Sequence, residues 1–124
     1  MKAFIIEDEL GLQVLYKAIL SGAGYEIFTA IDGQIAIDML EVGLVPDLII
    51  LDIRMLNRNG IEVMTYLQSH PQIDNMHLVI ATATQKFEQY VDMLPSVDFL
   101  LKPIFPAQLL EIVERLHVTD NTKV

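Results

Sequence analysis

Apolar and polar positions follow one another along this chain in two rhythms, one typical of strands and one typical of helices. Runs of about five apolar residues without alternation are typical of parallel strands that are covered on both faces. Between these runs, apolar residues recur three or four positions apart, which predicts amphipathic helices. The predicted strands are Lys2–Ile6, Tyr25–Ala30, Leu48–Leu51, His77–Ala81 and Asp98–Leu101. The predicted helices begin near residues 11, 35, 61, 85 and 106, and the last one ends near residue 116.

A strand followed by a helix, five times in succession, predicts an α/β fold with one parallel sheet. Because each crossover connection is right-handed, helices should cover both faces of that sheet. Five strands favour the flavodoxin-like order 2-1-3-4-5, which places the first and third strands side by side. We expect one domain over residues 1–124, with a core at about 2–117 and a polar, frayed tail at 118–124.

The central predicted strand ends in a carboxylate. Leu48–Leu51 is bounded by Pro46 and by Asp52, and the loop at 56–60 follows closely. In open α/β sheets, ligands and chemistry gather at the carboxyl ends of the strands. Asp52 is therefore a candidate nucleophile or metal ligand. An Asp that only caps the next turn would give the same local pattern.

The composition argues against several classes of protein. Apolar residues make up 52% of the chain, which argues against disorder, and the lack of cysteine excludes a disulfide or a thiolate nucleophile. A net charge of −9 repels nucleic acid and anionic lipid, so we expect neither DNA binding nor membrane binding. No apolar run approaches the ~18 residues of a membrane span, and the N-terminal run is too short for a signal peptide. These features predict a cytoplasmic protein.

The other distinctive polar residues fall at the same predicted edge of the sheet as Asp52. Glu7 and Asp8 follow the first strand, Thr82 follows the fourth, and Lys102 follows the fifth. Crowded carboxylates repel one another unless a cation joins them or one of them is protonated. Oxygen ligands without His or Cys favour Mg²⁺, with Mn²⁺ as an alternative. An aspartate nucleophile, a divalent ion and a lysine together suit the receipt of a phosphoryl group.

At these residues the chain resembles the receiver domain of bacterial two-component response regulators, over residues 2–116. The matching features are Glu7-Asp8, Asp52 in Leu-Asp-Ile-Arg-Met, Gly60, Thr82-Ala83 and Lys102-Pro103. The resemblance implies that Asp52 accepts a phosphoryl group from the phosphohistidine of a sensor histidine kinase or a phosphotransfer protein. It implies that Mg²⁺ is held by Asp8, Asp52 and the backbone carbonyl of Arg54, with Glu7 acting through water. It also implies a cis peptide bond at Lys102-Pro103.

The same resemblance implies a route by which a signal leaves the site. Thr82 is expected to move toward the phosphoryl group, and Phe99, at the family's aromatic switch position, is expected to swing inward. Arg54, Ala83 and Thr84 are expected at the mouth of the pocket. A long Arg54 side chain should shield the acyl phosphate from water there.

We therefore expect a signalling receiver without an output domain, which controls a separate protein through the face at 85–116. It should be a monomer or weak dimer, and not an enzyme beyond self-phosphorylation and slow autodephosphorylation. Alternatives are a receiver segment of a larger regulator or hybrid kinase, and a degenerate receiver that binds partners without phosphorylation. An aspartyl-nucleophile phosphohydrolase would carry a second Asp two residues after the first, where this chain has Arg54.

Structural roles are expected for the scattered histidines and tyrosines. His70, His77 and His117 occur singly, and we interpret them as loop or surface residues. Tyr16, Tyr66 and Tyr90 should be half-buried helix residues.

Overall fold

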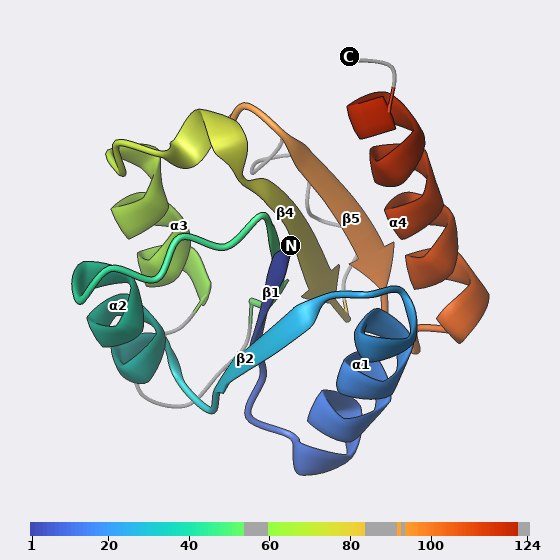
Figure 1. Cartoon of the computed structure of the whole chain (residues 1–124). Helices are drawn as coiled ribbons and strands as arrows, with labels where there is room; N and C mark the ends of the chain where they lie inside the picture. The colour runs from blue at the N-terminus through green and yellow to red at the C-terminus, as the bar shows by residue number, and fades with distance from the viewer. Residues whose placement is uncertain (54–59, 84–91, 93, 122–124) are drawn as a thin grey trace.

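The computed structural model of the chain describes residues 1–53, 60–83, 92 and 94–121 (Figure 1). Along these residues the structure has five strands and four α-helices, with an α-helix after the first, second, third and fifth strands. The strands are β1 (Lys2–Ile6), β2 (Glu26–Ala30), β3 (Leu48–Asp52), β4 (His77–Thr82) and β5 (Val97–Leu101). The helices are α1 (Leu10–Gly22), α2 (Gly33–Glu41), α3 (Gly60–Gln68) and α4 (Pro106–Asn121), with a short 3-10 helix, η1 (Ile73–Asn75), before β4.

The strands form one parallel sheet in the order β2-β1-β3-β4-β5, which confirms the predicted flavodoxin-like topology. β3 lies at the centre, and all five of its residues are buried. The register places Asp52, at the end of β3, opposite Ala81 of β4. The carboxyl ends of the strands therefore meet at one edge of the sheet, as the sequence predicted.

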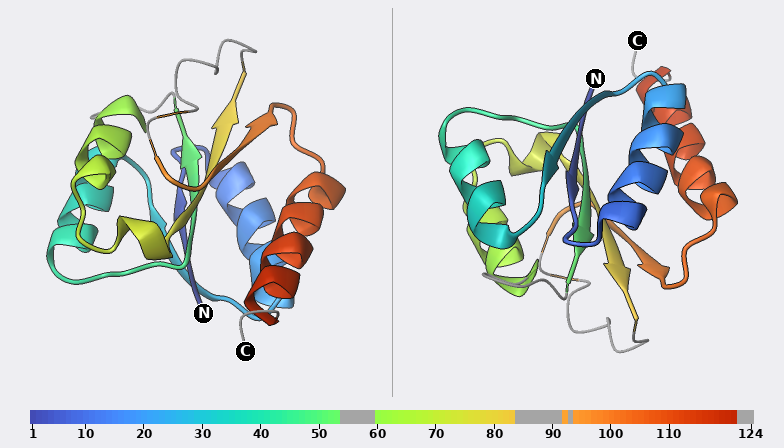
Figure 2. Two further views of the ribbon diagram at one scale, coloured as in Figure 1. Left: turned by 90° about the horizontal axis from the view of Figure 1, so that it is seen from above. Right: turned by 90° about the horizontal axis from the view of Figure 1, so that it is seen from below.

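Helices cover both faces of the sheet (Figures 1 and 2). α2 and α3 lie on one face, and α1 and α4 lie on the other. Each pair packs on its own apolar cluster, because successive residues of a strand point to opposite faces. In β4, for example, Leu78 and Ile80 belong to the cluster under α2 and α3, whereas Val79 and Ala81 belong to the cluster under α1 and α4.

Several predicted helix details differ from the structure. The most buried residues of α1 are Tyr16 and Leu20, so the expectation that Tyr16 is half-buried was wrong. Ile35 and Ile61, which belong to the apolar patterns that predicted α2 and α3, are 38% and 39% exposed. α4 continues to Asn121, beyond the predicted end near residue 116. The helix predicted at 85–94 lies outside the described residues, apart from Asp92 and Leu94.

Gly60 begins α3 directly against the end of β3. Its amide donates to the Ile53 carbonyl at 2.9 Å. A Cβ added at Gly60 would lie 2.6 Å from the Asp52 carbonyl oxygen and 2.6 Å from the Ile53 Cα. Backbone atoms cannot yield at such distances without moving the strand end. This contact gives the physical reason for a glycine eight positions after Asp52.

No helix within the described part of the chain combines the length and the apolar character that a membrane span requires.

Candidate functional site

Polar residues from four strand ends gather at the carboxyl edge of the sheet. Glu7 and Asp8 follow β1, Asp52 ends β3, Thr82 ends β4, and Lys102 follows β5. One carboxylate oxygen from each of Glu7, Asp8 and Asp52 lies within 4.8 Å of the other two. We call these three residues the acidic cluster. Glu7 and Asp52 are buried, and Asp8 is half-buried.

Lys102 brings a positive charge to the acidic cluster. Its Nζ lies 3.2 Å from Asp52 Oδ2 and 3.4 Å from Glu7 Oε1. Burial lowers the pKa of Lys102, but the carboxylates of Asp52 and Glu7 outweigh that effect, and the net shift is upward. Lys102 is therefore held in its charged form, directed at the candidate nucleophile.

Glu7 has a strongly altered affinity for protons. Burial, a side-chain hydrogen bond to Asp52 and the charge of Asp52 raise its pKa to about 8, against the opposing effects of Lys102 and the Glu9 amide. At neutral pH Glu7 thus carries a proton that it donates to Asp52. A divalent cation could replace that proton, since both relieve repulsion between the carboxylates.

The backbone around the acidic cluster is fixed by hydrogen bonds between elements. The Glu7 amide donates to the Ala30 carbonyl at 3.0 Å, and the Gln13 side chain donates to the Glu7 carbonyl at 2.5 Å. The Lys102 amide donates to the Thr82 carbonyl at 2.7 Å. Sequence reasoning missed Gln13, because a polar residue on an amphipathic helix gives no signal of such a role.

The peptide bond at Lys102-Pro103 is cis, which confirms the expectation drawn from the resemblance.

Tyr16 was also missed as a neighbour of this site. Its hydroxyl is buried and has no hydrogen-bond partner among the residues that the structure describes. Burial, followed by the charges of Glu7 and Asp52, raises its pKa. The ring therefore lies within electrostatic reach of the acidic cluster and can serve as an intrinsic fluorescent reporter of it.

The donor set fits a hard divalent cation. Three carboxylates supply oxygen ligands, and no histidine or cysteine belongs to the cluster. Mg²⁺ prefers oxygen ligands and is commonly bound through one or two carboxylates, with water completing its coordination. Glu7, Asp8 and Asp52 could therefore hold Mg²⁺ or Mn²⁺. Arg54, whose carbonyl was expected to join them, lies outside the described residues.

The two expected switch residues lie on the same face of the sheet. Ile80 pairs with Phe99 in the register of β4 and β5, and Thr82 is two residues beyond Ile80. Residues two apart on a strand share a face. Thr82 is buried and Phe99 is half-buried, packed against the apolar cluster under α2 and α3. At the expected pocket mouth, Ala83 is exposed, and Thr84 lies outside the described residues.

Comparison with known proteins identifies the family to which this chain belongs. The family model of the response regulator receiver domain matches residues 3–114, so this chain belongs to that family. The match covers the acidic cluster and, apart from Lys2, every residue of the five strands. It confirms the resemblance stated from the sequence.

Individual relatives agree with this assignment. The chain is 30% identical to the phosphate regulon transcriptional regulatory protein PhoB of Rhizobium meliloti over 117 residues, which cover 93% of this chain and 51% of that protein. The chain thus spans about half the length of that relative. The structure of the chemotaxis response regulator CheY4 of Vibrio cholerae is similar, with a TM-score of 0.82, 25% identity and coverage of 92% and 96% of the two chains.

A third similar structure is the receiver domain of a sensor histidine kinase from Pseudomonas aeruginosa. It has a TM-score of 0.79 and 23% identity, and covers 92% of this chain and 94% of that one. At that identity the likeness shows the fold alone. In that protein a magnesium ion is coordinated in the active-site cleft.

The proton on Glu7 predicts a pH-dependent metal affinity. Because this proton must leave before a cation binds, Mg²⁺ affinity should rise with pH up to about 8, the pKa of Glu7. Below that value each pH unit should weaken binding by up to about tenfold. Titrations of Mg²⁺ followed by tyrosine fluorescence, at several pH values, measure the slope.

Glu7→Gln is the control for this prediction, because it keeps the side-chain shape but has no proton to lose. Its Mg²⁺ affinity should be flat over the same pH range. A wild-type affinity that is equally flat would show that no Glu7 proton competes with the metal.

Proposed function

We propose that this receiver accepts a phosphoryl group on Asp52 from the phosphohistidine of a sensor histidine kinase or phosphotransfer protein. The observation that carries the proposal is the position of Lys102 Nζ, 3.2 Å from Asp52 Oδ2, beside three clustered carboxylates. A nucleophilic carboxylate, a fixed cation and a set of oxygen ligands are the parts that phosphoryl transfer to a protein requires.

In the proposed step, an Asp52 carboxylate oxygen forms a bond to phosphorus as the donor's P–N bond breaks. The electron pair of that bond goes to the donor's imidazole nitrogen. A bound Mg²⁺ would neutralise charge on the transferring oxygens. Lys102, whose Nζ lies 3.2 Å from Asp52 Oδ2, would neutralise further charge, and Asp8 and Glu7 would hold the metal ion together with Asp52. The acyl phosphate formed on Asp52 carries about two negative charges at neutral pH.

A phosphohydrolase that turns over small substrates is the weaker candidate. Such an enzyme needs a general acid near its aspartyl nucleophile, and the residue two positions after Asp52 is Arg54. Arg54 lies outside the described residues, so its expected role in shielding the acyl phosphate from water stays a prediction. Within the described residues, the protonated Glu7 is hydrogen-bonded to Asp52 itself.

We infer that the output is a change in partner binding at the face at 85–116, of which β5 and α4 are described. A phosphoryl group on Asp52 would draw the Thr82 hydroxyl toward it, and Phe99, on the same face of the sheet, would fill the space vacated. The partner is a separate protein or another domain of a longer regulator or hybrid kinase. A cytoplasmic location and a monomer or weak dimer are consistent with this role.

Labelling with acetyl phosphate tests the proposed chemistry. Intact-mass spectrometry should show the gain of one phosphoryl group in the presence of Mg²⁺ and none after chelation. Asp8→Asn should slow labelling by about a hundredfold or more, because it removes a metal ligand. Asp74→Asn, at an exposed carboxylate in η1, is the matched control and should label normally. Equal labelling with and without metal would contradict the proposed site.

The switch predicts that Thr82 is needed to transmit the signal. Beryllofluoride, a phosphoryl mimic, should shift backbone amide resonances in β5 and α4 of the wild-type protein as well as those near Asp52. In Thr82→Ala the shifts near Asp52 should remain, and those in β5 and α4 should largely disappear. Thr65→Ala, at an exposed threonine of α3, is the control. Shifts that spread equally in the Thr82 variant would refute this route.

A further inference from the structure

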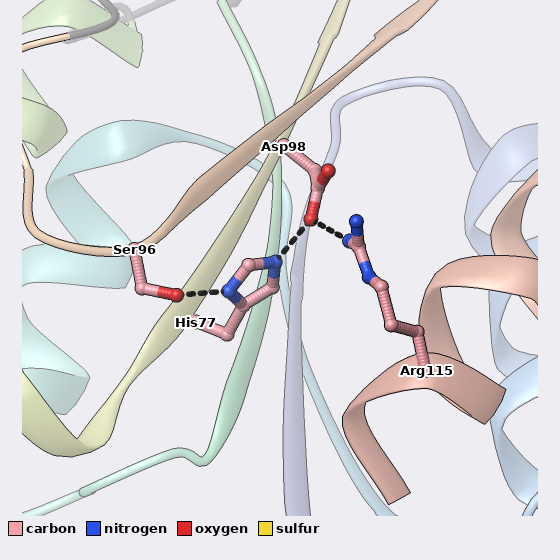
Figure 3. Close-up of polar contacts among 4 residues, drawn as sticks. All are labelled: His77, Ser96, Asp98 and Arg115. Atoms are coloured by element: carbon pink, nitrogen blue, oxygen red, sulfur yellow. Dashed lines mark hydrogen bonds and ion pairs between the residues drawn. The ribbon is translucent and has the colours of Figure 1, made fainter. Parts of the chain in front are cut away.

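A polar network lies at the start of β4, at the end of that strand opposite Thr82. It joins His77 to Ser96, Asp98 and Arg115, which come from the approach to β5, from β5 and from α4 (Figure 3). His77 was expected at the surface, and that expectation was wrong, because its side chain is only 12% exposed. Both of its ring nitrogens have partners. A network whose members satisfy one another holds three elements together and requires no ligand.

The Tyr16 hydroxyl is the opposite case, a buried polar group whose hydrogen-bonding capacity is unused. Tyr16 is 1% exposed, and its hydroxyl has no hydrogen-bond partner among the described residues. The other buried side-chain atom of this kind in that part of the chain is His117 Nε2, near the end of α4, where the ring stacks on Tyr25. A buried hydroxyl without a partner destabilises a fold, so its presence needs a physical reason.

The geometry of α1 directs the Tyr16 side chain toward the acidic cluster. α1 begins at Leu10, three residues after Glu7, and a helical side chain leans toward the N-terminus of its helix. Gln13 of the same helix reaches this place, because its side chain donates to the Glu7 carbonyl at 2.5 Å. Tyr16 lies three positions further along, where residues share a helix face with Gln13. Its longer side chain therefore extends back toward Glu7.

Glu7 and Tyr16 also lie on the same face of the sheet. Ile5 and Ile50 belong to the apolar cluster under α1 and α4, and so does Tyr16. Glu7 is two residues beyond Ile5 and Asp52 is two beyond Ile50, so both carboxylates share that face. Burial raises the pKa of Tyr16 most and the charge of Glu7 raises it next, which agrees with this placement.

The Glu7 carboxylate is loosely held by its present donors. Its oxygens accept from the Glu9 amide at 3.3 Å and from Lys102 Nζ at 3.4 Å, both longer than the roughly 2.7–3.2 Å of a typical hydrogen bond. Carboxylates that bind a metal ion are in turn held by hydrogen bonds from neighbouring groups, which fix their orientation. The Tyr16 hydroxyl is a neutral, buried donor that can supply such a bond.

We propose that Tyr16 is a positioning residue of the metal site, whose hydroxyl donates to the Glu7 carboxylate when a divalent cation occupies the acidic cluster. In the metal-free protein Glu7 shares a hydrogen bond with Asp52 instead, and the Tyr16 hydroxyl is left unpaired. The inference rests on the proposed function only in requiring that the acidic cluster bind a cation. Phosphorylation of Asp52 plays no part in it.

Two effects of opposite sign follow for Tyr16→Phe, which removes the hydroxyl and keeps the ring. Without metal, the loss of an unpaired buried hydroxyl should raise the melting temperature by roughly 3–5 °C. With metal, the loss of the donor should weaken Mg²⁺ binding by about tenfold or more, the usual effect of removing a group that orients a metal ligand. A tyrosine that only filled space in the core would not produce this combination.

Thermal unfolding with a chelator present and isothermal titration calorimetry with magnesium chloride measure the two effects on the unphosphorylated full chain. Calorimetry replaces fluorescence here, because Tyr16 itself contributes to the tyrosine signal. Tyr66→Phe is the matched control, since Tyr66 is half-buried in α3 and packs on the apolar cluster of the other face of the sheet. This variant should bind Mg²⁺ with the affinity of the wild type.

Glu7→Ala tests whether Tyr16 acts through Glu7. Asp8 and Asp52 remain in this variant, so Mg²⁺ should still bind, with a lower affinity. Adding Tyr16→Phe to Glu7→Ala should lower the affinity no further, because both changes remove the same interaction. A further loss of about tenfold in the double variant would show that Tyr16 acts elsewhere, and would overturn the proposal. If Glu7→Ala binds too weakly to measure, Tyr16→Phe alone decides.

The proposal fails if Tyr16→Phe binds Mg²⁺ as tightly as the wild type. It also fails if the metal-free melting temperature of this variant does not rise, since the hydroxyl would then already have a partner. A wild type that binds no Mg²⁺ would refute the metal site of the proposed function and this inference with it. Tight binding by both proteins would refute the inference alone, and a failure of Asp52 to accept a phosphoryl group would change neither measurement.

Discussion

Asp52→Asn should leave the protein folded and abolish phosphorylation by acetyl phosphate. The amide has nearly the shape of the carboxylate and can still accept the hydrogen bond from Glu7. It lacks the negatively charged oxygen that must attack phosphorus, so no acyl phosphate can form. Intact-mass spectrometry should detect the added phosphoryl group in the wild type and none in the variant. Thermal unfolding should show that both proteins fold.

Asp47→Asn is the matched control, because Asp47 lies immediately before the opposite end of the same strand. Asp47 is exposed and accepts from the Lys2 amide at 2.7 Å, a bond that Asn can also accept. This variant should be phosphorylated like the wild type. If Asp52→Asn were labelled normally, the acceptor would be another residue, and the assignment built on Lys102 and the acidic cluster would be wrong.

The sequence predicted the location of the site because parallel topology brings strand ends together. The apolar runs located the strands. Glu7, Asp52 and Lys102 each stand at the carboxyl end of a predicted strand, which was enough to predict that the three residues lie at the same edge of the sheet. Their separation in sequence did not matter, since each follows or ends its own strand. The apolar runs located all five strands, although β2 and β5 at the edges of the sheet are only partly buried. The strand order was predicted from the preference of five-stranded folds for the flavodoxin-like arrangement and not from the apolar pattern.

Helix faces were predicted less well, for a geometric reason. The same apolar positions allow a helix to pack in several orientations, which differ by a small rotation about the helix axis. Packing against the sheet decides which of these positions become buried. Tyr16 thus became the buried centre of α1, while Ile61 of α3 turned partly outward. Neither result follows from the periodicity alone, because both side chains are apolar enough to be either buried against the sheet or partly exposed.

The His77 network lay beyond sequence reasoning for a different reason. A single histidine at the start of a strand has the same local pattern whether its ring faces water or a partner. Its partners, Asp98 and Arg115, are far along the chain, and the crossover after β4 determines whether they meet. The burial of Glu7, which raises its pKa, was hidden for the same reason. An acidic pair at a strand end does not reveal which of its members faces inward.

The other large effect is expected from Gly60→Ala, which should destabilise the fold and disturb the acceptor. The new Cβ would lie 2.6 Å from the Asp52 carbonyl oxygen and 2.6 Å from the Ile53 Cα, both of them backbone atoms. Relief of such contacts requires α3 to move away from β3, which costs about 2–3 kcal/mol by analogy with overpacked cores. For a domain of this size, that loss lowers the melting temperature by roughly 8–12 °C.

Gly22→Ala is the control for this substitution, since Gly22 also lies within a helix but has nothing within 4 Å of an added Cβ. It should be neutral or stabilising by up to about 1 kcal/mol, because alanine favours helix more than glycine does. Differential scanning calorimetry compares the two variants. Gly60→Ala should also weaken Mg²⁺ binding, since the strand end that must move carries Asp52. A Gly60 variant with the stability and metal affinity of the wild type would mean that the start of α3 yields without moving β3, and that the glycine is not required for the position of the acceptor.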